Sequence, residues 1–229
     1  MSFPEISRSI TTLNKLHKLL SQWGCRGYIV GGFIRDWLLG RQTNDVDIAV
    51  DGNALSIARD VAKELGGKFV LLDEANGIAR VMVKEWHLDF SSFSGDIKSD
   101  LARRDFTINA MATALSHLKA NSSLRLIDPF SGKEDLENRI VRAVSDQIFQ
   151  ADAVRLLRAV RLAAELNFAI EPETEGLIRR YFQSITKIPG ERVREELLRL
   201  LSLPRAYYHL RYLDQLGLLL ALIPELKES

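Results

Sequence analysis

The sequence has one cysteine, Cys25, among its 229 residues. A single cysteine excludes an internal disulfide and gives no zinc-binding motif. No apolar stretch approaches the roughly 18 uninterrupted residues that indicate a membrane-spanning helix, so we expect no membrane span. Residues 1–8 lack the charged start and the apolar run of a signal peptide, and a cytoplasmic location is therefore expected.

A strong excess of one charge is also lacking, because the formal net charge is only +1. This near neutrality does not exclude a nucleic-acid binder, since the clustering of basic residues matters more than their sum. Arginines do cluster in this chain: Arg103, Arg104, Arg139, Arg142, Arg155, Arg158, Arg161, Arg179, Arg180, Arg192, Arg194 and Arg199. Otherwise, 46% hydrophobic and 27% charged residues are typical of a globular protein.

The spacing of apolar residues predicts an α+β chain. Up to about residue 130 it predicts helices at 4–22, 53–65 and 101–115, a short helix ending at Gly40, and strands at 28–30, 45–50, 68–72, 78–83, 86–90 and 124–127. Beyond that point it predicts helices alone, at 134–141, 147–168, 172–183, 190–202 and 205–217. We therefore expect a mixed-sheet domain at 1–133 and an all-α domain at 134–229.

Two adjacent glycines follow the apolar run 28–30. Gly31 and Gly32 allow a tight turn and a close approach of the backbone to a ligand. Backbone N–H groups at such a strand-to-helix turn can bind phosphate. Arg35, in the short helix that follows, adds a forked donor of the kind that pairs with phosphate oxygens.

Acidic residues stand on the next predicted strand. Asp45 and Asp47 point to one face of the strand 45–50, because side chains alternate along a strand. Two neighbouring carboxylates repel each other, and a hard divalent cation such as Mg²⁺ relieves this repulsion because it prefers oxygen ligands. Asp89 is a further acidic residue placed between apolar neighbours, which suggests that its carboxylate has a function.

A second pattern, R-R-D-F-T-x-N-A, covers Arg103 to Ala110. Together with G-G-x-x-R-D-x-L-L-G-R-x-x-x-D-x-D at 31–47, it resembles the class II tRNA nucleotidyltransferases, the family of CCA-adding enzymes and bacterial poly(A) polymerases within the polymerase-beta-like superfamily. The resemblance extends over about residues 25–225. It implies a catalytic head domain at 1–133 and a helical neck domain at 134–229 that selects the nucleotide and binds RNA.

The resemblance also implies a reaction and its site. CMP or AMP is expected to pass from CTP or ATP to the 3′ end of tRNA by a two-metal Mg²⁺ mechanism. Asp45 and Asp47 are the expected metal ligands, and Asp89 is the expected third carboxylate. The residues expected to contact the nucleotide are Gly31, Gly32, Arg35, Arg104, Asp105, Asn109, Asp152, Arg155, Arg158 and Arg161.

The run from Asp152 to Arg161 resembles the helix with which the family selects the incoming base. On a single helix, Asp152 and Arg155 are neighbours at i and i+3. Cytosine and adenine both show an amino group beside a bare ring nitrogen, which suits one acceptor and one donor. Uracil and guanine show the reverse pattern and are rejected. Arg158 is expected to reach phosphate, and Arg161 either joins the site or pairs with a neighbouring helix.

The chain departs from the family in three places. Ala151 replaces the glutamate that opens the base-selecting motif, which puts the fine tuning of base choice in doubt. The loop 94–103 is short, which favours CC addition or a divergent enzyme. The body and tail that grip the tRNA elbow are absent from this sequence, so we expect them to be truncated or to lie on a separate polypeptide.

Two other functions remain open. Poly(A) polymerase or A-adding activity shares every motif quoted above. A catalytically inactive RNA-binding module that has kept the fold is the alternative from another class, although the intact Asp45 and Asp47 pair argues against it.

Overall fold

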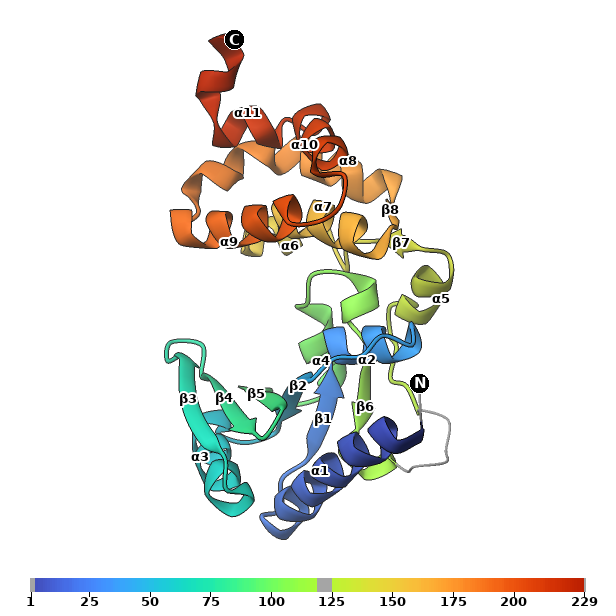
Figure 1. The fold of residues 1–229 in the computed structure, drawn as a ribbon, viewed down its shortest axis with the longest axis vertical. Coiled ribbons are helices and arrows are strands. Elements are labelled where there is room, and N and C mark those ends of the chain that lie inside the picture. Colours follow the sequence, from blue (N-terminus) through green and yellow to red (C-terminus); the bar gives the residue numbers. More distant parts are fainter. Residues whose placement is uncertain (1–2, 119–124, 229) are drawn as a thin grey trace. The chain divides into compact units, whose positions relative to one another are not determined.

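The computed structural model describes residues 3–118 and 125–228, which form two compact units (Figure 1). The first unit contains the residues up to Ala102 together with Asn109–Phe130. The second contains Arg103–Ile108 and the residues from Ser131 onward. The predicted α+β class is confirmed. The expected division of function at residue 133 stays a prediction.

The first unit is built on a six-stranded mixed sheet in the order β3-β4-β5-β2-β1-β6. Its elements are α1 (Phe3–Gln22), β1 (Gly27–Val30), α2 (Gly32–Leu38), β2 (Asp45–Val50), α3 (Ala54–Leu65), β3 (Lys68–Asp73), β4 (Ile78–Val83), β5 (Trp86–Ser92), α4 (Ile97–Ala102), the 3₁₀ turn η1 (Thr107–Asn109, shared between the two units), β6 (Ala112–Ala114) and the 3₁₀ turn η2 (Leu115–His117). Each strand predicted between residues 28 and 90 is present.

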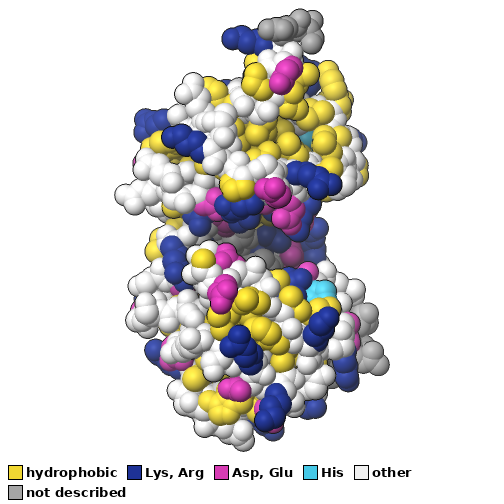
Figure 2. Space-filling model, turned by 90° about the vertical axis from the view of Figure 1, so that its left-hand side faces the viewer, with side chains coloured by type: hydrophobic (Ala, Val, Ile, Leu, Met, Phe, Trp, Pro, Cys, Tyr) yellow, Lys and Arg dark blue, Asp and Glu magenta, His cyan; other side chains and the backbone are white. Residues whose placement is uncertain are grey.

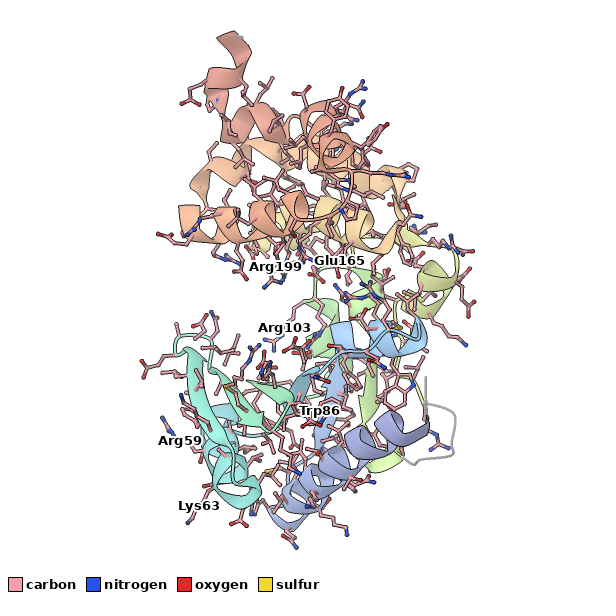
Figure 3. All side chains as sticks on the ribbon, viewed as in Figure 1. Arg59, Lys63, Trp86, Arg103, Glu165 and Arg199 are labelled. Carbon is pink, nitrogen blue, oxygen red and sulfur yellow. The ribbon has the colours of Figure 1, made fainter. Side chains whose placement is uncertain are left out.

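One face of this sheet is covered by helices and the other carries polar side chains. The covered face packs its buried side chains, such as Val46, Ile48 and Leu88, into a core shared with α1 and α3. Trp86, at the start of β5, belongs to this core, on the α1 side of the sheet (Figure 3). Because side chains alternate, the residues between these apolar positions lie on the opposite face.

Local signals placed several element ends correctly. Asn53 begins α3 as expected, because its side chain accepts a hydrogen bond from the Ser56 N–H at 2.9 Å. Gly40 follows α2 with φ +68°, a left-handed conformation that glycine adopts without strain. The predicted hairpin at Asn76-Gly77 joins β3 to β4.

The helix predicted at 101–115 is wrong. α4 ends at Ala102, and the chain then forms η1 and β6. All the apolar side chains between residues 106 and 112 are fully buried although they do not share one helix face: Phe106, Ile108, Ala110, Met111 and Ala112. The backbone finds other partners instead: the Thr107 N–H donates to the Arg142 carbonyl at 2.9 Å. Tertiary pairing has therefore overridden a helical pattern.

The strand predicted at 124–127 is reduced to a single bridge. Ile127 pairs with Ala112, and each donates its backbone N–H to the other's carbonyl at 2.8 and 3.0 Å. Leu124 lies outside the described residues. The bridge extends the pairing of β6, so the predicted segment does reach the sheet.

The second unit is mostly helical. Its elements are α5 (Gly132–Glu137), β7 (Ile140–Val141), α6 (Ile148–Ala151), α7 (Arg155–Leu166), β8 (Ala169–Ile170), α8 (Pro172–Tyr181), the 3₁₀ turn η3 (Phe182–Lys187), α9 (Gly190–Leu201), α10 (Ala206–Gln215), α11 (Leu218–Leu222) and the 3₁₀ turn η4 (Pro224–Glu228). Within the described residues of the whole chain, none of the helices has the length and apolar character needed to cross a membrane.

The all-α prediction for this unit needs correction, because β7 and β8 form a two-stranded parallel sheet. The helix predicted at 134–141 stops at Glu137, and Arg139 then takes a left-handed conformation with φ +58°. This turn directs Ile140 and Val141 into extended pairing with Ala169 and Ile170.

The single helix predicted at 147–168 is also wrong, since it is interrupted at Asp152. This residue separates α6 from α7 and is extended, with φ −156° and ψ 102°. Its side chain accepts a hydrogen bond from the Val154 N–H at 3.3 Å. Aspartate competes for backbone N–H groups in this way and is favoured at helix starts. Asp152 and Arg155 therefore do not share one helix face.

Glu171 caps α8, and its removal gives a testable effect on stability. Its carboxylate accepts hydrogen bonds from the Thr174 N–H and hydroxyl at 2.7 and 2.8 Å and pairs with Arg142 at 3.1 Å. Burial by itself raises the pKa of Glu171, but the Thr174 hydrogen bonds and Arg142 outweigh it and lower the pKa. We expect Glu171→Ala to lower the free energy of unfolding at neutral pH by about 1 kcal/mol.

The pH dependence of this effect follows from the direction of the shift. A lowered folded-state pKa contributes stability that is present above the ordinary glutamate pKa of about 4.3 and is lost as the pH falls through the folded value. Urea unfolding at neutral and acidic pH should therefore show the wild type losing its advantage over Glu171→Ala in acid. The exposed neighbour Glu173→Ala is the control, and an equal loss in both variants would contradict the capping role.

The second unit also exposes large hydrophobic side chains on its last helices, and Figure 2 shows hydrophobic atoms on its surface. The exposed residues are Leu198, Leu201, Tyr207, Tyr208, Leu220, Ile223 and Leu226. An exposed apolar area of this kind is typical of an interaction surface.

Candidate functional site

The turn after β1 has the predicted glycine geometry. Gly31 has φ +72° and ψ −139°, a conformation that side chains with a Cβ rarely adopt. Its N–H donates to the Met111 carbonyl at 3.3 Å, so this amide is hydrogen-bonded to the residue that precedes β6. A Cβ on Gly32 would lie 3.5 Å from the Arg35 guanidinium, within ordinary contact distance.

Arg35 is buried beneath this turn and has protein partners. Its Nη1 donates to the Asn109 side-chain oxygen at 2.7 Å, and Nε and Nη2 donate to the Asp36 carboxylate at 3.1 and 2.8 Å. Two residues predicted for the nucleotide site, Arg35 and Asn109, are thus brought together although 74 positions separate them. In this arrangement Arg35 fixes Asn109, and contact of either residue with a nucleotide stays a prediction.

The acidic residues lie on the open face of the sheet. On β2, Asp45 and Asp47 are exposed while Val46 and Ile48 are buried. β2 and β5 are parallel, and their register places Asp47 beside Asp89 and Asp45 beside His87. The three predicted acids therefore stand on one face of two neighbouring strands. We call Asp45, Asp47 and Asp89 the acid face.

Two residues that the sequence left unassigned contact the acid face. Arg80 on β4 donates from Nε and Nη2 to the two Asp89 oxygens at 2.7 and 2.8 Å. Its Nη2 also lies 3.9 Å from an Asp45 oxygen. The hydrogen bond to Asp89 raises the pKa of Arg80 above its usual value. His87 Nδ1 lies 2.9 Å from Asp45 Oδ1.

The sequence did contain a signal for both residues. His87 lies two positions before Asp89, which places it on the same strand face. Lys84-Glu85 forms the turn between the antiparallel strands β4 and β5. Residues at equal distances from this turn are paired, and Arg80 is therefore paired with Asp89. Within residues 3–118 and 125–228, no three His, Cys, Asp or Glu side chains gather closely enough to hold a metal ion. Arg80 binds the Asp89 carboxylate instead.

The Arg-Arg-Asp segment belongs to the second unit. Asp105 is buried, and its carboxylate accepts hydrogen bonds from the Phe106 N–H at 2.8 Å and from Arg158 Nη1 at 3.3 Å. The Asp105 carbonyl also accepts the Val144 N–H at 3.1 Å. Asp105 thus joins its own segment to α7. Arg104 stands beside it in the same unit, and its contact with a nucleotide stays a prediction.

Asp152 and Arg155 have separate partners. The Asp152 carboxylate forms two bonds with Arg192, at 3.1 and 2.8 Å. Arg155 donates to the carbonyls of Arg103 at 3.0 Å and Ile148 at 3.4 Å. Arg155 Nε is buried without a hydrogen-bond partner in the described structure, and burial lowers the pKa of this guanidinium.

The last two arginines of the motif share one carboxylate on α9. Arg158 Nε and Arg161 Nε donate to the two oxygens of Glu196 at 3.0 and 2.5 Å. Burial by itself lowers the pKa of Arg158, but Asp105 and Glu196 outweigh it and raise the pKa above its ordinary value. Arg161 also pairs with Glu165 at 2.7 Å. The ion pair with a neighbouring helix, left open for Arg161 above, is therefore present.

Comparison with known proteins identifies two family matches in this chain. Residues 27–142 match the Poly A polymerase head domain, and residues 167–229 match the probable RNA and SrmB-binding site of polymerase A. The CC-adding tRNA nucleotidyltransferase of Geobacter sulfurreducens is 43% identical over 186 residues, which cover 80% of this chain and 42% of that protein. The A-adding tRNA nucleotidyltransferase of Deinococcus radiodurans is 39% identical over 206 residues, covering 88% and 46%.

A solved structure agrees with these matches. The Thermotoga maritima CCA-adding enzyme complexed with tRNA-CCA superimposes with a TM-score of 0.83 at 35% identity, covering 93% of this chain and 52% of that one. The chain spans about half the length of the relatives it matches.

Proposed function

This chain belongs to the family of tRNA nucleotidyltransferases and bacterial poly(A) polymerases, and we propose that it adds CMP, AMP or both from CTP and ATP to the 3′ end of tRNA. The observation that carries the proposal is the acid face. Asp45 and Asp47 are exposed on β2, and the strand register brings Asp89 beside Asp47. The inactive RNA-binding alternative gives no reason for this arrangement.

The donor set of the acid face suits a divalent cation. Its donor atoms are hard carboxylate oxygens, which divalent cations such as Mg²⁺ prefer. The acid face already attracts one positive group, because the Arg80 guanidinium lies 3.9 Å from Asp45. Transfer from a nucleoside triphosphate uses divalent cations, and we propose Mg²⁺ held by Asp45 and Asp47. When bound, the cation neutralises charge on the phosphates and lowers the pKa of the attacking hydroxyl.

The protein's own residues position the reactants. Asp45 and Asp47 fix the site because they lie on a strand paired on both sides, with β1 and β5. Arg80 orients the Asp89 carboxylate through two hydrogen bonds. Asp89 thereby acts as the third carboxylate through its charge beside Asp47. Arg35 holds Asn109, for which we propose contact with the ribose.

Nucleotide selection is proposed for the second unit. Asp152 supplies the acceptor for the amino group of cytosine or adenine, and an arginine supplies the donor for the adjacent ring nitrogen. A buried mismatched polar group costs about 1–3 kcal/mol, which disfavours uracil and guanine at such a site. Arg104 and Arg158 are proposed to add positive charge for the triphosphate.

The proposed partners are the tRNA 3′ end and the nucleotides, and the proposed location is the cytoplasm. The exposed hydrophobic side chains of α9 to η4 support a further partner, namely the expected body and tail in the same chain or on a separate polypeptide. The relatives named above are a CC-adding and an A-adding enzyme. Which nucleotide this chain adds must therefore be determined by experiment.

The test is incubation with labelled CTP or ATP, Mg²⁺ and three tRNA transcripts, ending before CCA, after one C or after two. We expect incorporation of CMP, AMP or both on the matching transcripts. Long A-tails without C would identify a poly(A) polymerase. The absence of incorporation on every transcript would overturn the proposed activity in favour of the RNA-binding module.

A further inference from the structure

Asp152 is held by a residue 40 positions away. Arg192, in the first turn of α9, directs Nη1 to Asp152 Oδ1 at 3.1 Å and Nη2 to Oδ2 at 2.8 Å. A guanidinium bonded to both carboxylate oxygens fixes the orientation of the carboxylate. The Val154 N–H adds a third bond, to Oδ1.

Arg155 does not perform this task in the structure. Its guanidinium donates to the backbone carbonyls of Arg103 and Ile148. Asp152 itself lies outside α7, in an extended conformation. The acceptor that the proposed function assigns to the base is therefore fixed by a different helix from the one that carries Arg155.

The same face of α9 contacts two further arginines of the motif. Glu196 lies four residues after Arg192, and residues four apart share one face of a helix. Its carboxylate binds Arg158 and Arg161, both on α7. The side chains of α7 and α9, marked by Glu165 and Arg199, can be followed in Figure 3. α9 thus contacts three of the four charged residues predicted in this motif for the nucleotide.

We propose that Arg192 is a positioning residue that determines nucleotide choice by holding the Asp152 carboxylate in one orientation. The inference rests on the proposed function. A fixed acceptor can meet the amino group of cytosine or adenine. A carboxylate released from Arg192 can turn and accept the ring N–H of uracil instead, so the preference for CTP over UTP falls.

The ion pair is well suited to a test because its loss should not unfold the protein. Arg192 is 48% exposed and Asp152 24%, and ion pairs near the surface contribute about 0–1 kcal/mol to stability. The variants are Arg192→Gln, which removes both the two-pronged guanidinium donor and its positive charge, and Arg192→Lys, which keeps only the positive charge. The control is Arg199→Gln, which breaks the exposed pair with Glu195 on the same helix.

The measurements are kcat and KM for CTP and for UTP on tRNA that lacks CCA, together with the midpoint of thermal unfolding. We expect Arg192→Gln to raise the KM for CTP about tenfold and to reduce the preference for CTP over UTP about tenfold, with a smaller change in kcat. Arg192→Lys should lie between Arg192→Gln and the wild type. Arg199→Gln should match the wild type, and all variants should unfold at nearly the same temperature.

Each outcome separates this inference from the function on which it rests. If the wild type incorporates CMP and Arg192→Gln retains the wild-type preference and KM, the positioning role is wrong and the proposed function stands. If kcat falls with unchanged preference, or if Arg199→Gln shows the same loss, Arg192 has no role in nucleotide choice. If the wild type incorporates no nucleotide, the proposed function and this inference fail together.

Discussion

Asp47→Asn should reduce nucleotide incorporation by about a thousandfold or more, which equals a loss of about 4 kcal/mol of transition-state stabilisation. The amide keeps the size of the side chain but removes the negative charge that a divalent cation needs. Asp47 lies at the centre of the acid face. It is paired with Asp89 on the neighbouring strand β5 and is two residues from Asp45 on its own strand. Asp45→Asn should have a similar effect. The measurement is the initial rate of labelled CMP or AMP transfer to tRNA.

The same substitution should leave the fold intact. Asp47 is exposed, and like charges directly opposite each other on neighbouring strands are destabilising. Asp47→Asn should therefore change the free energy of unfolding by no more than about 0.5 kcal/mol, or raise it slightly. The control is Asp60→Asn, an exposed carboxylate on α3, which should keep both activity and stability. Strong unfolding of Asp47→Asn would assign Asp47 a structural role instead.

Glu196→Ala should strongly destabilise the second unit, by about 3–5 kcal/mol. The Glu196 side chain is only 9% exposed and serves Arg158 and Arg161 at once. Removing it leaves the buried Arg161 guanidinium paired with Glu165 alone among the carboxylates described above, and it withdraws one of the two carboxylates that bind Arg158. A buried charge without its partner costs far more than the intact pair contributes.

The matching control is the preceding residue on the helix, Glu195. Glu195 is 63% exposed and pairs with Arg199 at 2.7 Å, so Glu195→Ala removes an ion pair of the same type in solvent. It should change stability by less than about 1 kcal/mol. Far-UV circular dichroism during thermal unfolding reports on both variants, because helices dominate this unit. Similar midpoints for Glu195→Ala and Glu196→Ala would show that the buried network contributes little.

Local sequence patterns were sufficient for the elements around the acid face. Alternation in residues 45–48 predicted that the two acids are exposed and the two apolar side chains buried, because side-chain direction along a strand depends on the backbone. Asn53 and Gly40 marked element ends for equally local reasons, hydrogen bonding and left-handed backbone freedom. The mixed sheet followed by helices could therefore be predicted from the sequence.

Contacts between distant residues could not be predicted in the same way. The helix expected at 101–115 is absent because Thr107 pairs with the backbone at Arg142. The break at Asp152 depends on its own side chain and is accompanied by the bond to Arg192, 40 residues later. Helical periodicity contains no information about either partner. For this reason the sequence identified Asp152 but missed Arg192 and Glu196.

Metal binding by the acid face tests the central claim most directly. Mn²⁺ is a suitable probe because carboxylate sites that accept Mg²⁺ also accept it, and its free concentration can be followed by electron paramagnetic resonance. Titration of the wild type and of Asp47→Asn should show Mn²⁺ binding to the wild type that is at least about tenfold weaker in the variant. Equal affinity in the two proteins would contradict the assignment of Asp47 as a metal ligand.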